Sequence, residues 1–66
     1  MFNIYGFEFY FINEVGRICS DVNVKFISSR NLVSAMNAFE EELEKRNQTV
    51  KLIRITEGSR VIEEYI

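Results

Sequence analysis

The chain has 66 residues and a formal net charge of -2, with a single Cys and no His, Pro or Trp. This length allows one domain, residues 1–66, and a hydrophobic content of 47% is too high for a disordered chain. One Cys excludes an internal disulfide, and without His it leaves no ligand set for structural zinc. We therefore expect neither a metal nor another cofactor, and we expect stability to come from the core or from self-association.

The N-terminal segment is apolar but does not have the features of a secretory signal. No positive side chain precedes Arg17, so the basic region that such a signal needs is missing. The longest unbroken apolar run, residues 9–12, is far shorter than the roughly 20 residues of a membrane span. A lone Cys suits a reducing compartment, so we expect a cytoplasmic protein without membrane contact.

Residues 2–12 are rich in aromatic and β-branched side chains, which favours a β-strand. The even positions are mixed, whereas the odd positions are wholly aromatic and should face the core. These odd residues are Tyr5, Phe7, Phe9 and Phe11.

A hairpin is expected next. Asn13 suits the first position of a type I turn, and Gly16 can supply the positive φ of a bulged hairpin loop. Residues 17–27 should then return as a second strand. Their alternation places Val24 and Phe26 on one face, and Lys25 and Ile27 on the other.

The hydrophobic period becomes helical after several residues suited to capping a helix N-terminus. Residues 31–46 are predicted to form a helix that basic residues end favourably, with Asn47 as a left-handed cap. Its apolar stripe consists of Leu32, Ala35, Met36, Phe39 and Leu43.

Residues 49–56 and 60–66 are predicted to be two further strands joined by a loop that contains Gly58. The order β-β-α-β-β with short connections indicates an α+β fold, a small ββαββ domain in which one helix packs on one face of an antiparallel sheet. A single bulge in either of the last two strands would exchange the faces of their side chains.

A helix of about four turns covers only one face of such a sheet. The uncovered face should carry several large apolar residues, and a contiguous exposed apolar patch often marks an interaction surface. The predicted interface residues are Ile4, Tyr10, Ile12, Ile27, Ile53 and Ile55, and Ile62 and Ile66 are further candidates for this face. The alternative is that the sheet curls or a chain end folds over, which hides the patch within the monomer.

The residue types argue against an enzyme. Nucleophilic catalysis usually needs a His or Lys base, and Cys19 has no helix N-terminus of its own to activate it. The Glu residues of segment 40–44 point around the helix rather than converging, and they indicate a solvated surface. Glu8 is expected to pair with Lys25 or Arg54 across the sheet. An active site shared between subunits could still be built from Glu, Arg and Tyr.

Nucleic-acid binding through the sheet face is the alternative function. Its residues would be Arg17, Lys25, Lys51 and Arg54, with Tyr10 stacking on a base. It requires these four basic residues on one contiguous face, and the net charge of -2 argues against it. Mimicry of DNA by the acidic helix is a weaker idea for the same reason.

The residues therefore predict a non-catalytic interaction protein that self-associates, as a homo-oligomer expected to be a dimer, or docks to another protein. Small proteins of this kind are common as accessory proteins, including those of phages and mobile elements.

Overall fold

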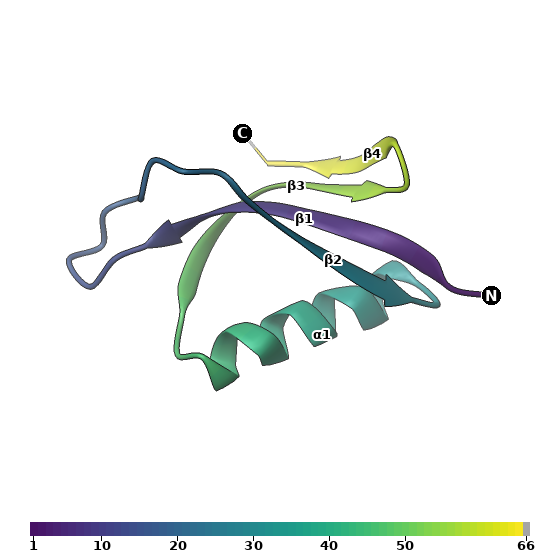
Figure 1. The fold of residues 1–66 in the computed structure, drawn as a ribbon, viewed down its shortest axis with the longest axis horizontal. Coiled ribbons are helices and arrows are strands. Elements are labelled where there is room, and N and C mark those ends of the chain that lie inside the picture. The colour runs from purple at the N-terminus through teal and green to yellow at the C-terminus, as the bar shows by residue number, and fades with distance from the viewer. Residues whose placement is uncertain (66) are drawn as a thin grey trace.

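The computed structural model describes residues 1–65 and has one antiparallel sheet with one helix along one of its faces (Figure 1). The strands lie in the spatial order β2-β1-β3-β4, so β1 and β3 are central and β2 and β4 form the edges. This confirms the predicted ββαββ α+β fold. The elements are β1 (Asn3–Ile12), β2 (Asn23–Ser29), α1 (Leu32–Lys45), β3 (Thr49–Glu57) and β4 (Arg60–Glu64).

The turn after β1 has the predicted geometry. The Gly16 N–H donates to the Asn13 carbonyl at 2.9 Å, and Gly16 has a φ of 81°, which is the left-handed conformation expected for this loop. The Asn13 Oδ1 also accepts from the N–H groups of Val15 and Arg17. Asn13 therefore organises the whole turn through its side chain and its backbone.

The second strand is shorter than predicted and starts later. Ile18 makes only an isolated bridge to Ile12, and the regular ladder begins again where Asn23 pairs with Phe9. Between these pairs β1 advances by three residues and the returning chain by five, so two extra residues interrupt the ladder. The Asn23 side chain donates to the Asp21 carbonyl, a local hydrogen bond that competes with strand pairing.

Helix α1 forms over nearly the predicted range and is capped at both ends by Asn residues. The Asn31 side chain accepts from the Ser34 N–H at 2.8 Å. At the other end Asn47 has a φ of 52°, and the Gln48 N–H donates to the Leu43 carbonyl, as in a left-handed helix cap. Both caps satisfy backbone groups that the ends of a helix leave without partners.

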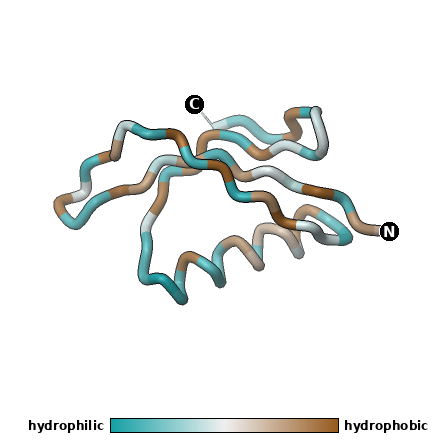
Figure 2. The backbone as a smooth tube through the Cα atoms, in the orientation of Figure 1, coloured by the Kyte–Doolittle hydropathy of each residue, from teal (hydrophilic) through white to brown (hydrophobic). Residues whose placement is uncertain are grey.

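The core lies between α1 and the odd-numbered side of β1, as predicted. Phe39 of α1 stacks on Phe7 of β1 with ring centroids 4.6 Å apart and planes 8° from parallel. Phe7 and Ile55 are fully buried. Hydrophobic residues recur along all the strands and the helix in Figure 2, but the buried hydrophobic set is small: Tyr5, Phe7, Phe9, Ala35, Phe39 and Ile55.

Two irregularities in register involve β3. Glu8 pairs with Arg54 and Phe9 with Leu52, so Ile53 is an extra residue in β3. A second shift, between Ile55 and Thr56, leaves Ile62 as an extra residue in β4. Bulges of this kind change which face the following side chains occupy, and they decide the composition of the uncovered face.

We predict that Phe39→Leu lowers the free energy of unfolding by at least about 1 kcal/mol, because it removes an aromatic stacking partner and some core volume. Urea unfolding measures this change. Val33→Ala on the outer side of the same helix is the control, since Val33 is 68% exposed and its truncation should cost less than about 0.5 kcal/mol. Equal losses for both variants would contradict this description of the core.

Candidate interaction surface on the uncovered sheet face

The side of the sheet away from α1, here called the open face, is defined by the strand register. Phe7 is in the core, so the even-numbered residues of β1 before and after it point to the open face. Their partners in the adjacent strands point the same way. One row across the sheet joins Phe26, Gly6, Thr56 and Val61, and the next joins Val24, Glu8, Arg54 and Glu64.

Apolar side chains gather on the β1–β2 half of the open face. Phe26 is 66% exposed, Ile4 is 58% exposed and Val24 is 50% exposed. Phe26 pairs with Gly6, next to Ile4 on one side and Val24 on the other. We call Ile4, Gly6, Val24 and Phe26 the Phe26 cluster. Further along the same face Ile12 pairs with Ile18, which is 48% exposed.

Gly6 has a specific role in this cluster. A Cβ at Gly6 would lie 3.2 Å from the Phe26 ring and 2.6 Å from Thr56 Oγ1. Phe26 therefore rests over the backbone of β1 at the one position of this strand without a side chain.

Charged side chains occupy the middle of the open face beside the Phe26 cluster. Arg54 lies 3.7 Å from a Glu8 oxygen and 3.6 Å from a Glu64 oxygen. Arg54 Nε is itself buried and finds no hydrogen-bond partner among residues 1–65. The predicted cross-sheet pairing of Glu8 with Arg54 is confirmed, and the open face is therefore apolar on one half and charged at its centre.

The predicted interface residues are divided by the structure. Ile4 lies on the open face, as do Tyr10 and Ile12, which are partly buried and pair with Lys51 and Thr49 of β3. Ile53 occupies the bulge in β3 and is also partly buried. The placement of Ile27 and Ile55 on the uncovered face was wrong.

The two errors have different causes. Ile55 is fully buried against Phe7, because the bulge at Ile53 moves it to the helix side of the sheet. Ile27 pairs with buried Tyr5 and packs against the core. Ile62 also packs against the core, and Ile66 lies outside the described residues.

The sequence interpretation missed Val24 and Phe26, although a signal for them was present. The Asn13 N–H donates to the Arg17 carbonyl across the turn, which pairs residues of the same parity in the two strands. Even residues of β2 must then share a face with Gly6 rather than with Phe7. The interruption that follows the turn adds two residues, an even number, so this parity is kept in β2 and Phe26 is exposed on the open face.

The four basic residues of the nucleic-acid hypothesis do not lie on one face. Lys25 pairs with Phe7 and points to the helix side, whereas Lys51 and Arg54 lie on the open face. Arg17 belongs to the turn beyond β1, and Arg54 is already paired with two carboxylates. The nucleic-acid hypothesis required these four residues on one contiguous face, and the structure does not place them so.

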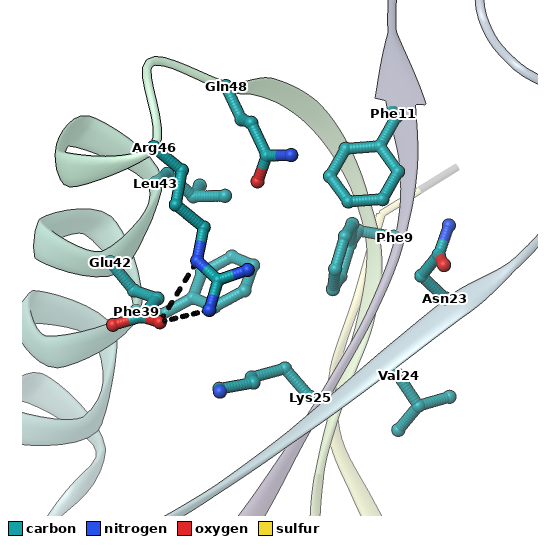
Figure 3. Close-up of a pocket in the computed structure, with 10 residues that line it drawn as sticks. All are labelled: Phe9, Phe11, Asn23, Val24, Lys25, Phe39, Glu42, Leu43, Arg46 and Gln48. Carbon is teal, nitrogen blue, oxygen red and sulfur yellow. Dashed lines mark hydrogen bonds and ion pairs between the residues drawn. The ribbon is translucent and has the colours of Figure 1, made fainter.

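A shallow groove lies on the other side of the sheet, between the C-terminal half of α1 and strands β1 and β2 (Figure 3). Its volume is about 180 Å³. Phe9, Phe11 and Phe39 form its apolar wall, and Lys25 reaches over it from β2. Arg46 at its rim is bonded to Glu42 at 3.1 Å. The groove is small and open, and its charged lining residues are Lys25, Glu42 and Arg46.

Other candidate sites give no converging chemistry. Within residues 1–65 no three Asp, Glu, Cys or His side chains are placed to hold a metal ion. Cys19 is a free, exposed thiol. None of the helices among the described residues has the length and apolar character needed to cross a membrane.

Comparison of the chain with models of protein families, with curated proteins and with solved structures finds no match.

We predict that Gly6→Ala destabilises the protein by roughly 1–3 kcal/mol, since the new methyl group would overlap the Thr56 hydroxyl and press on the Phe26 ring. Urea unfolding is the measurement. The double variant Gly6→Ala/Thr56→Ala should recover part of the loss because it removes the closer contact. Unchanged stability of Gly6→Ala would mean that Phe26 does not rest on Gly6.

Proposed function

We propose that this protein is a non-catalytic interaction protein, which associates with a second copy or with another protein through the open face of its sheet. The observation that carries this proposal is the 66% exposure of Phe26, which strand pairing places beside Ile4 and Val24. An exposed aromatic ring with apolar neighbours is a typical anchor of a protein contact.

The distribution of exposed apolar residues supports the open face over the rest of the surface. Val33 on α1 and Val15 in the turn are also exposed, but each stands apart from the Phe26 cluster, and single exposed apolar residues are ordinary. The Phe26 cluster is different because strand pairing places its members side by side. Burying one such large side chain contributes about 1.5–3 kcal/mol.

The size of the chain supports the same proposal. A domain of about 60 residues buries only about 60% of the surface of its unfolded chain and is correspondingly marginal. The buried hydrophobic set among the described residues consists of one Ala, one Ile and four aromatic residues. Contact over the open face adds apolar burial that the isolated fold does not contain.

The central ion pairs define how a partner approaches. Burying charged groups without compensation is costly, so a partner that covers Arg54 must keep Glu8 and Glu64 beside it or replace them. The simplest contact is therefore offset to the β1–β2 half, where the Phe26 cluster lies. We place this association in the cytoplasm as part of the proposal, since the exposed thiol of Cys19 suits a reducing compartment.

We predict that Phe26→Ser weakens the association roughly tenfold or more, because truncating an aromatic anchor costs on the order of 2 kcal/mol of binding free energy. Sedimentation equilibrium of the purified chain at micromolar concentrations measures the self-association. Val33→Ser, at an equally exposed Val on α1, is the matched control and should leave it unchanged.

A wild-type chain that stays monomeric, and that captures no protein whose binding depends on Phe26, would overturn the proposal. Equal weakening by Phe26→Ser and Val33→Ser would instead show that the contact lies elsewhere. Urea unfolding of each variant separates loss of binding from loss of folding.

A further inference from the structure

Strand β2 has an unpaired edge whose hydrogen-bonding groups can be assigned from its neighbour. The Gly58 N–H donates to the Ile4 carbonyl on the β3 side, and the Cys19 N–H donates to the Phe11 carbonyl on the β2 side. Odd residues of β1 therefore bond toward β2, and even residues bond toward β3. In β2 the odd residues bond to β1, so the backbone groups of Val24, Phe26 and Ser28 point outward from the sheet.

The two edges of the sheet are protected to different degrees. Strand β4 has only five residues, contains a bulge and carries the charges of Arg60, Glu63 and Glu64. Strand β2 has seven residues, pairs with β1 without any register shift, and carries Lys25 as its only charge. Charges, bulges and shortness are the features that keep edge strands from pairing with other chains, and β2 has the fewest of them.

We infer that β2 pairs edge to edge with β2 of a second copy, in the antiparallel direction, about a twofold axis at Phe26. This inference rests on the proposed function and names its partner and geometry. Phe26 is the central residue of Asn23–Ser29, so an axis at this position pairs the whole strand. Each copy contributes four strands, and the product is one continuous eight-stranded sheet.

The side chains are compatible with this register. Phe26 pairs with Phe26 of the second copy, and Val24 pairs with Ser28 of the second copy. The backbone groups of these three residues point outward from the sheet, so they can form the hydrogen bonds between the copies. Lys25, the only charge of the strand, faces the partner's Ile27, so no like charges lie directly opposite one another. The Phe26 clusters of the two copies then join into one apolar surface on the open face.

The helices leave room for the pairing. Phe39 stacks on Phe7, so α1 lies over β1 at this point, while other parts of the helix contact β2. Three strand spacings of about 4.8 Å separate β1 from its equivalent in the second copy, so the two helices are about 14 Å apart at the level of Phe39. Helices in contact are about 8–10 Å apart, so these two do not collide there. The space between them contains both signs of charge, because Lys25 and Glu42 line the same groove.

The test uses the full chain made by chemical synthesis, with the Phe26 amide nitrogen methylated. The methyl group removes an outward donor and blocks the edge, but it leaves the Phe26 side chain and the ladder to β1 in place. We expect the dimer to dissociate roughly tenfold or more readily in sedimentation equilibrium, since two interchain hydrogen bonds are lost. Methylation of the Val61 amide, on the outer edge of β4, is the matched control and should have no effect.

Hydrogen exchange of the unmodified chain provides a second measurement that needs no variant. Exchange at the amides of Val24, Phe26 and Ser28 should slow as the protein concentration rises, because these groups become bonded only in the dimer. Unchanged exchange at these amides in a chain that dimerises would overturn the edge-to-edge geometry.

The outcomes distinguish this inference from the proposed function. A dimer that resists Phe26 amide methylation but is weakened by Phe26→Ser overturns edge pairing and supports contact through the open face alone. A chain that is monomeric at all concentrations overturns edge pairing, and the proposed function then depends on a different protein partner.

Discussion

The stacking of Phe39 on Phe7 is the contact on which the rest of the structure depends. It joins α1 to β1, one of the two central strands of the sheet, and the remaining buried side chains pack around it. Because one helix supplies the entire cover, the molecule has two unlike sides. One side has its apolar residues enclosed, and the other exposes Phe26 above Gly6.

The turn at Asn13 and the two extra residues that follow it together determine which residues are exposed on that second side. By closing the chain between Asn13 and Arg17, the turn pairs even residues of β1 with even residues of β2. Gly6 then meets Phe26 rather than a neighbour of opposite parity, and Ile27 turns inward beside Tyr5. A local hydrogen-bond pattern thus selects the chemistry of a surface that lies several residues away.

The sequence predicts the elements and the core well, because their signals are local. The aromatic odd positions of residues 2–12, the capping Asn31 and the positive φ of Asn47 all follow from residue type and spacing. The open face was harder to predict, because it depends on register. No residue type near Ile53 indicates the bulge that buries Ile55. The pairing is also interrupted at residues 19–22, so β2 is shorter than the alternation of its sequence predicts.

The unequal protection of the two sheet edges has a consequence for the size of any assembly. A sheet in which both edge strands can pair with other copies adds copies without limit and grows into a fibre. A sheet in which only one edge strand can pair stops at a dimer. In this molecule the border formed by β4 is short, kinked and charged. Association through β2 would therefore stop at a dimer. The charged β4 strands of the two copies would then form the two outer edges of the dimer's sheet.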